Sequence, residues 1–321
     1  MPLDHFVSQV HLRNFCSPVL NERLYAIRKS DLKRFEPRSQ DVCRIEDNST
    51  NAYLKEDRAI EEFLKDVEPR YNTSLAKLRD NKIDQECVFC IAAYAAYIVT
   101  CAPAAMRIYS GPLKTLLHST AAILDAKGAL GKAPEALGEK SLSELLADGT
   151  VKFNVDPKYP QAIGIASVMH HVSVFGNSPW EILRNSEANN SFFTSDYPAA
   201  IEVVDLNTPI NRILPLAPDL AIRIRPDIQL SETEADLSFA KFKAVQRPLK
   251  RVEVLDINRL IVRCAEDLIL YRDDQDWIEN FVAKNRQYRI EPVTRQIPHG
   301  DGILNVSTQR ILARTDEAHD R

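Results

Sequence analysis

The stretch CVFCIAAYAAYIVTCA, residues 87–102, has no charged side chain and is apolar at nearly every position. A helix that is apolar all round must be buried on every side. The segment from Ile83 to Tyr109 therefore predicts a helix at the centre of the molecule. Pro103 should bend or end this helix, because proline has no backbone N–H to donate. The rest of the chain has to cover it.

The same stretch contains Cys87 and Cys90, which have the spacing of a C-x-x-C metal or redox motif. No second pair and no histidine at zinc-finger spacing accompanies them, so packing of two small thiols on one helix face is the favoured interpretation. The six cysteines form no regular framework. The first residues are neither basic nor a long apolar run. Together these features predict a cytoplasmic protein without a signal peptide.

Toward the N-terminus, residues 51–80 repeat apolar side chains with the period of a helix, and Pro69 should kink or divide that helix. Residues 23–29 alternate like a short strand. After about Trp180 the apolar runs become shorter, which is typical of strands. We expect further helices at 112–127, 141–147, 161–174, 254–271 and 276–284, and strands at 180–183, 192–195, 200–204, 213–216 and 220–224.

These elements predict a helix-rich α+β fold. The N-terminal and central helices should pack on a small mixed or antiparallel sheet formed mainly by the later part of the chain. Because no Gly/Ser linker interrupts the apolar pattern, we expect one globular domain over residues 1–285. It would be helix-rich over 1–175 and strand-containing over 176–285, followed by a polar C-terminal tail over 286–321.

Composition excludes several functions. The net charge is -4, so no overall field attracts nucleic acid or an anionic membrane. No apolar run reaches the roughly 20 residues of a membrane span, and we expect no membrane partner. The chain has only nine glycines and neither a dinucleotide-binding nor a P-loop motif. G-x-S-x-G and H-E-x-x-H are absent as well, and the sequence does not predict the oligomeric state.

Two places carry polar side chains in a pattern that suggests chemistry. His5 and Gln9 are four residues apart, so a helical turn would put both on one face, with His5 as a general base or a surface histidine. Thr194 and Asp196 directly follow an apolar strand, where active sites are often found. The alternative for Asp196 is a turn in which its carboxylate accepts nearby backbone N–H groups.

A basic stretch lies between Lys241 and Arg263, where basic side chains outnumber acidic ones. It includes Arg259 and Arg263, which follow Asn258 on the predicted 254–271 helix. This surface would suit phosphate groups, although a solvated helix face is the more common explanation for such a pattern.

Four segments together resemble a family. The opening HFVSQVHLRNF (5–15), the central FTSDYP (193–198), LPLAP (214–218) and the segment from Asn258 to Tyr271 are similar to the motifs of an uncharacterised, mainly microbial family called domain of unknown function 4238. The resemblance extends from His5 to about Tyr271, and it implies a shared fold and a bacterial origin. It brings no known activity. Its polar members are His5, Gln9, Thr194, Asp196 and Asn258.

From this set we expect a cytoplasmic hydrolase that acts on a phosphodiester or nucleotide, with a nucleic acid or nucleotide as partner. His5 would serve as base or metal ligand and Asp196 as its orienting group or a second ligand of a divalent metal. Gln9, Thr194 and Asn258 would position the substrate, and Arg259 or Arg263 would face its phosphate. The alternative is a non-enzymatic binding or sensor module, in defence or stress, whose motif residues form a buried hydrogen-bond network.

Overall fold

The apolar stretch forms the central helix, as its composition predicts. In the computed structural model, which describes residues 3–187, 190–204, 209–227, 235–300 and 302–314, it is helix α3 (Gln85–Cys101), and nearly every side chain on it is buried. The carboxylate of Asp84 caps its N-terminus by accepting the N–H of Cys87 at 2.9 Å. Helix α4 (Pro103–Ala126) begins at Pro103, a position where a missing N–H costs nothing, and is bent 56° from α3.

The two thiols of the C-x-x-C pair are packing residues, as expected. Cys87 donates to the carbonyl of Ser74 and Cys90 to that of Val67, both at 3.4 Å. Burial raises the pKa of Cys87 to about 12 and that of Cys90 to about 11, so neither is a thiolate at neutral pH. All six cysteines are free.

Helix α2 (Ala59–Arg79) lies beside α3 and is shorter than predicted. It begins at Ala59 instead of Asn51. Asn51 forms a local turn in place of a helix start: its Oδ1 accepts the N–H of Tyr53, two residues on, at 3.0 Å, and its Nδ2 donates to the carbonyl of Lys158 at 2.7 Å. Pro69 does not divide the helix. The buried stripe of α2 continues on both sides of Pro69 and packs into the core, which offsets the one lost backbone hydrogen bond.

The later part of the chain forms a mixed five-stranded sheet, which confirms the α+β prediction. Its strand order is β10-β5-β9-β8-β7, with β10 parallel to β5 and the other pairs antiparallel. The predicted strand at 220–224 has the predicted bounds. The strands are β5 (Pro179–Asn185), β7 (Ala200–Glu202), β8 (Asn211–Ala217), β9 (Leu220–Ile224) and β10 (Lys243–Leu249).

A second sheet, of order β3-β2-β11-β6, joins the two ends of the fold. Its strands are β2 (Tyr25–Arg28), β3 (Arg34–Phe35), β6 (Thr194–Ser195) and β11 (Leu268–Tyr271). The prediction of one helix over 254–271 is therefore wrong: α8 (Arg251–Cys264) ends before β11. The sequence LILY is buried between β2 and β6, and their ladders satisfy its backbone groups.

The remaining elements complete a core that extends from Val7 to Ile290. Helices α6 and α7 pack on α3, and α8 packs against β7 and β6. These elements are β1 (Leu3–His5), α1 (Gln9–Arg13), η1 (Ser39–Asp41), β4 (Arg44–Glu46), η2 (Glu135–Leu137), α5 (Leu142–Ala147), α6 (Lys158–Ala166), α7 (Val168–Asn177) and α9 (Trp277–Asn285).

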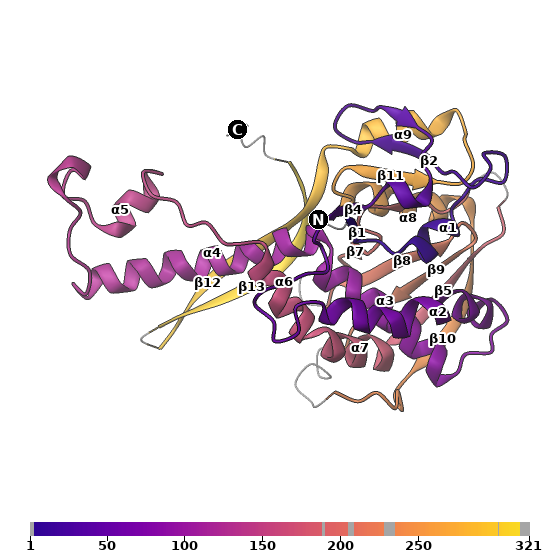
Figure 1. Ribbon diagram of the computed structural model, residues 1–321, viewed down its shortest axis with the longest axis horizontal. Coiled ribbons are helices and arrows are strands. Elements are labelled where there is room, and N and C mark those ends of the chain that lie inside the picture. The colour runs from indigo at the N-terminus through magenta and orange to yellow at the C-terminus, as the bar shows by residue number, and fades with distance from the viewer. Residues whose placement is uncertain (1–2, 188–189, 205–208, 228–234, 301, 315–321) are drawn as a thin grey trace.

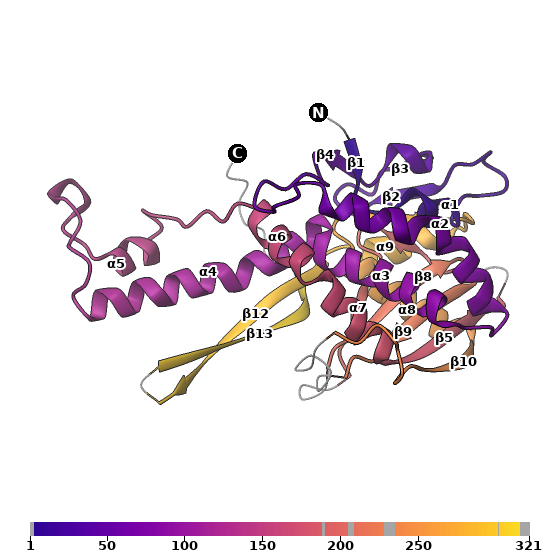
Figure 2. The same ribbon diagram turned by 60° about the horizontal axis from the view of Figure 1, so that its bottom comes forward.

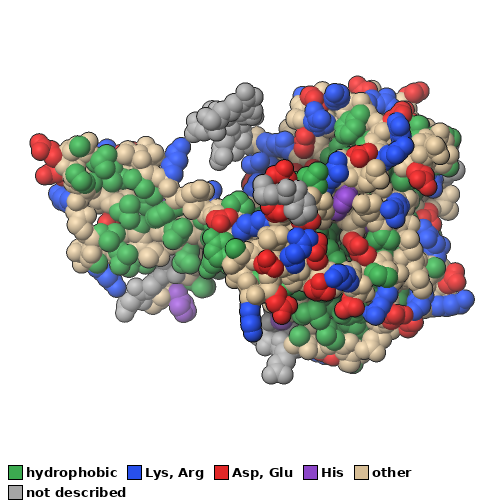
Figure 3. Space-filling model, viewed as in Figure 1, with side chains coloured by type: hydrophobic (Ala, Val, Ile, Leu, Met, Phe, Trp, Pro, Cys, Tyr) green, Lys and Arg blue, Asp and Glu red, His purple; other side chains and the backbone are tan. Residues whose placement is uncertain are grey.

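An arm extends from this body (Figures 1 and 2). It consists of the outer part of α4, helix α5 and a hairpin of β12 (Tyr288–His299) and β13 (Gly302–Ala313), whose strands pack on α4. Where the sequence predicts a polar tail over 286–321, residues 288–313 thus form a hairpin; residues 315–321 lie outside the described part. Hydrophobic side chains gather on the arm (Figure 3). Leu116, on helix α4, is 54% exposed.

Within the described part of the chain, no single helix has the length and apolar composition of a membrane span. Helices α3 and α4 reach both only when they are taken together across their bend.

Candidate functional site

Thr194 belongs to a sealed network around a histidine that the sequence analysis did not select. His11 is fully buried; its Nδ1 lies 2.8 Å from the hydroxyl of Tyr71 and its Nε2 2.8 Å from Oγ1 of Thr194. The imidazole stacks on Tyr94 with ring centroids 5.1 Å apart. Burial lowers the pKa of His11 to about 3, so it stays neutral at physiological pH. The network joins α1, α2 and β6.

Asp196 holds the turn between α8 and β11. Its carboxylate accepts the backbone N–H groups of Glu266 at 2.9 Å, Asp267 at 2.7 Å and Leu268 at 2.8 Å. The alternative of a carboxylate that satisfies backbone donors is what the structure shows, but the donors come from a distant segment instead of its own turn. Burial raises the pKa of Asp196 to about 6, and the hydrogen bonds from Asp267 and Leu268 oppose that rise.

Lys29 is the buried cation near Asp196. Only 1% of this residue is exposed, and its ammonium donates to the carbonyls of Ala265 at 2.5 Å and Tyr288 at 2.9 Å. Burial lowers its pKa to about 8, whereas the negative charge of Asp196 acts in the opposite direction. The lysine thus connects β2, the end of α8 and the start of the hairpin.

Asn258 is fully buried on α8 and has a structural task. Its Oδ1 accepts the N–H of Phe193 at 2.9 Å, and its Nδ2 donates to the carbonyl of Ser191 at 2.9 Å. The amide therefore holds the segment before β6 against the helix. Both hydrogen-bonding groups of the side chain are occupied, and it is closed off from any ligand.

His5 and Gln9 lie elsewhere. His5 ends β1 and borders a cavity of about 490 Å³ together with Glu61, Lys65 and Glu68. Burial lowers the pKa of His5, and its hydrogen bonds to the main chain of Ser39 and Gln40 oppose that decrease. Its Nε2 has no hydrogen-bond partner among the described residues. Gln9 accepts a hydrogen bond from Arg13 at 3.0 Å.

Among the described residues, no hydrogen bond or ion pair joins His5 or Gln9 to the three motif residues of the core, Thr194, Asp196 and Asn258. Nor do these residues fit the expected divalent metal. Across the ranges that the structure describes, no group of three or more His, Cys, Asp or Glu side chains is placed to hold a metal ion. His5 and Asp196 therefore do not form a metal site, and no step of a reaction is assigned to one.

The two arginines of the basic stretch that were expected to face phosphate both have partners within the protein. Arg259 pairs with Asp256 at 2.6 Å. Arg263 donates to Oδ1 of Asn285 at 2.8 Å, and its guanidinium lies 4.5 Å from the centre of the Tyr288 ring. Both of the arginines expected to face phosphate are thus engaged within the protein.

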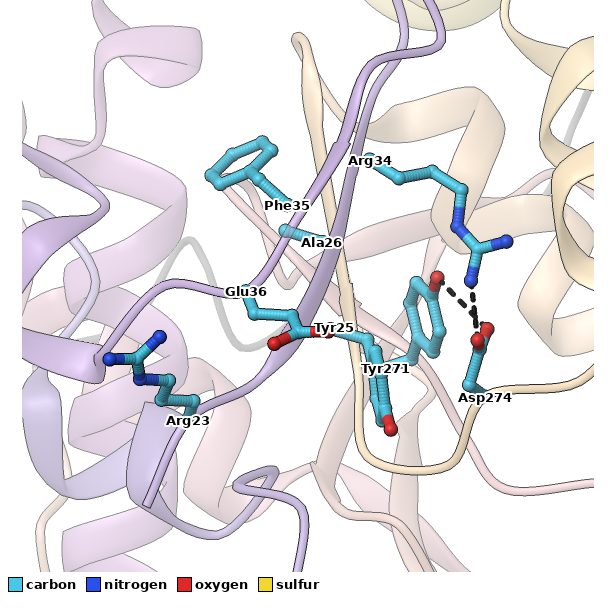
Figure 4. Close-up of a pocket in the computed structure, with 8 residues that line it drawn as sticks. All are labelled: Arg23, Tyr25, Ala26, Arg34, Phe35, Glu36, Tyr271 and Asp274. Atoms are coloured by element: carbon cyan, nitrogen blue, oxygen red, sulfur yellow. Dashed lines mark hydrogen bonds and ion pairs between the residues drawn. The ribbon is translucent and has the colours of Figure 1, made fainter. Parts of the chain in front are cut away.

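A different cavity combines aromatic rings with arginines, at the edge of the second sheet (Figure 4). It measures about 400 Å³. Tyr25 and Tyr271 stack at its base, with centroids 5.6 Å apart and 15° between the rings. Arg23 and Glu36 lie on one side of the pair and Arg34 on the other (Figure 4).

The two arginines of this cavity differ in their ion pairs. Arg34 pairs with Asp274 and, at 3.8 Å, with Glu279. The side chain of Arg23 is exposed and has no ion pair within the residues that the structure describes. The amino-acid sequence does not point to this site. Its signal was limited to the alternating segment at 23–29, and only pairing of β2 with β11 brings Tyr25 against Tyr271.

Comparison with known proteins gives a family and no activity. The family model described as "Protein of unknown function (DUF4238)" matches residues 4–275, a range that includes all the motif residues discussed above. No curated protein and no solved structure matches this chain. Because the family model covers most of its length, the chain belongs to the DUF4238 family.

Proposed function

We propose that this protein is a binding module for a nucleotide, and that the nucleotide occupies the cavity of Figure 4, hereafter the tyrosine cavity. The observation that carries the proposal is the unpaired guanidinium of Arg23 beside the stacked pair of Tyr25 and Tyr271. The motif residues Thr194, Asp196 and Asn258 support it indirectly, because their polar groups are already used inside the fold.

Each part of a nucleotide finds a suitable group in the tyrosine cavity. A nucleotide base of any kind can stack on an aromatic ring. Tyr25 is only half-buried, so a base can reach it. Arg23 offers a planar set of donors that suits phosphate oxygens. The carboxylate of Glu36 is an acceptor for ribose hydroxyls, a role that acidic side chains have in dinucleotide sites. The volume of about 400 Å³ is within the range of small-ligand pockets.

The test is calorimetric titration of the full chain with AMP, ATP and adenosine. We expect Arg23→Gln to weaken AMP and ATP about 10- to 100-fold, since hydrogen bonds to a charged group contribute about 1.5–3 kcal/mol, and to leave adenosine unchanged. Tyr25→Ala should weaken all three ligands. Arg44→Gln, an exposed arginine outside the cavity, is the matched control. Absence of binding at millimolar nucleotide, or equal binding by wild type and both variants, refutes the proposal.

A second candidate function, hydrolysis of a nucleotide or phosphodiester, is favoured by His5 alone. Burial favours the neutral imidazole, and because Nε2 has no partner among the described residues, it is Nδ1 that donates to the main chain of Ser39 and Gln40. A neutral imidazole with a free Nε2 is a general base. That nitrogen is shielded from solvent, so the ring has to turn toward the neighbouring cavity to reach a substrate.

Turnover distinguishes this candidate from simple binding. Incubation with RNA, DNA and nucleotides should then give products that His5→Ala abolishes and His118→Ala, a change of an exposed histidine on α4, preserves. If the wild-type protein leaves every one of these substrates intact while nucleotides still bind, hydrolysis is excluded and the binding module stands.

A further inference from the structure

An apolar cavity lies at the base of the arm, apart from the tyrosine cavity. Its volume is about 550 Å³. Helices α3, α4 and α7 form one side, and the hairpin and the residues leading into β8 form the other. Its apolar wall includes Val99, Ile108, Phe175, Ile210, Pro292 and Val306.

One charged group faces this apolar wall. Arg212, the second residue of β8, lines the cavity and donates from Nη2 to Oε1 of Gln309 on β13 at 2.8 Å. Its Nη1 is buried and has no hydrogen-bond partner in the part of the chain that the structure describes. The lining contains no aspartate or glutamate among the described residues. A buried charged donor without a partner is costly, so an anion that meets Nη1 is bound favourably. Because Nη1 is shielded from solvent, the guanidinium has to turn toward the cavity to meet such an anion.

The other polar groups of the cavity do not repel an anion. Nδ1 of His171 lies 3.0 Å from the carbonyl of Ser167, to which it donates, which leaves Nε2 as an uncharged acceptor. Burial lowers the pKa of His171 and keeps it neutral. Burial also raises the pKa of Tyr109, so its hydroxyl keeps its proton and is a donor; Arg212 is close enough to oppose that rise.

We infer that this cavity binds an amphipathic carboxylic acid, with its carboxylate on Nη1 of Arg212 and its hydrocarbon part against the apolar wall. The arrangement matches small-molecule sites in general, which are mostly apolar with a few placed polar groups. The inference does not depend on the tyrosine cavity, since the two sites share no residue. Because Gln309 and Val306 of the hairpin line the cavity, a bound ligand would also stabilise the packing of the hairpin against the body.

The test compares two probes of equal chain length, decanoate and 1-decanol, by calorimetric titration of the full chain below their aggregation concentrations. Wild-type protein should bind decanoate at least about tenfold more tightly than 1-decanol, the factor that corresponds to one modest charge-assisted contact. Gln309→Glu places a carboxylate beside Arg212 without removing the arginine. It should reduce the affinity for decanoate about tenfold or more, leave 1-decanol unchanged, and raise the melting temperature.

Gln296→Glu is the control: it makes the same change on the same hairpin, outside the lining of the cavity. It should bind decanoate like wild type. Arg212→Met, which removes the charge, should bind the acid and the alcohol equally; if it fails to fold, Gln309→Glu decides the outcome. Failure of decanoate to bind, or equal affinities of wild type and Gln309→Glu for decanoate, overturns the inference. Neither result bears on nucleotide binding.

Discussion

Acid should destabilise this protein through His11, the buried histidine between Tyr71 and Thr194. In the unfolded chain this imidazole gains a proton near pH 6.5, whereas in the folded chain its pKa is lowered to about 3 by burial. Between these values the unfolded state binds one more proton than the folded state. The stability that the neutral histidine contributes is therefore complete above pH 6.5 and is lost as the pH falls toward 3.

The size of the effect follows from this window. Each pH unit below 6.5 costs about 1.36 kcal/mol as long as only the unfolded state is protonated. At pH 5 the loss from His11 is therefore about 2 kcal/mol. Since whole domains are stable by only about 5–15 kcal/mol, urea unfolding resolves such a change.

The assay is urea unfolding of wild type and His11→Gln at pH 8 and pH 5. Glutamine can still donate to one neighbour and accept from the other, but it does not titrate. We expect His11→Gln to be less stable than wild type at pH 8 and to lose about 2 kcal/mol less on going to pH 5. His118→Gln, at an exposed site, should keep the wild-type pH dependence. If His11→Gln loses as much stability as wild type, the sealed network is not the source of acid sensitivity.

Three substitutions test the other contacts that hold the fold, each by the free energy of unfolding. Asp196→Asn removes the charge that three backbone N–H groups and a buried lysine face, and should cost about 3–5 kcal/mol; a cost below about 1 kcal/mol contradicts this role. Asn258→Ala leaves a buried donor and a buried acceptor unpaired and should cost roughly 2–4 kcal/mol, and a near-neutral result would show that water replaces the amide. Gly164→Ala places a Cβ 2.4 Å from the carbonyl oxygen of Thr100 and should cost about 1–3 kcal/mol. Gly131→Ala, with open space around it, should be near neutral, and equal effects of the two changes would refute the close approach of α6 to α3.

The sequence predicted the presence of helices and strands better than the residues at which they begin and end. The strand at 220–224 was predictable because a short apolar run and the turn residues that flank it act locally. Residues 265–271 were not, because a run such as LILY suits a buried helix and a buried strand equally. Only the neighbours β2 and β6 make it a strand. The hairpin over 288–313 was missed for a related reason: its strands are polar, and they are held by each other and by α4.

For the candidate site, the sequence indicated which polar residues are engaged but not which partners they contact. Their place after an apolar strand and the order of the motifs selected Thr194 and Asp196, and motif order selected Asn258; each is engaged in polar contacts. Their partners could not be inferred, because hydrogen bonds between residues as far apart as His11 and Thr194 depend on tertiary packing. Burial then decided their role, since a side chain whose donors and acceptors are satisfied inside the core has none left for a substrate.

The amino-acid sequence by itself determined the buried central helix, the α+β class and the family, because apolar periodicity and motif order are properties of the chain alone. Tertiary structure decided which polar groups face a ligand. Arg23 and Arg212 are ordinary arginines in the sequence. Among the described residues, only the fold leaves the first without an ion pair beside two tyrosines and the second with a buried, unpartnered nitrogen. The physical reason is that a hydrogen bond or charge pair depends on neighbours within a few ångströms, and the sequence does not list those neighbours.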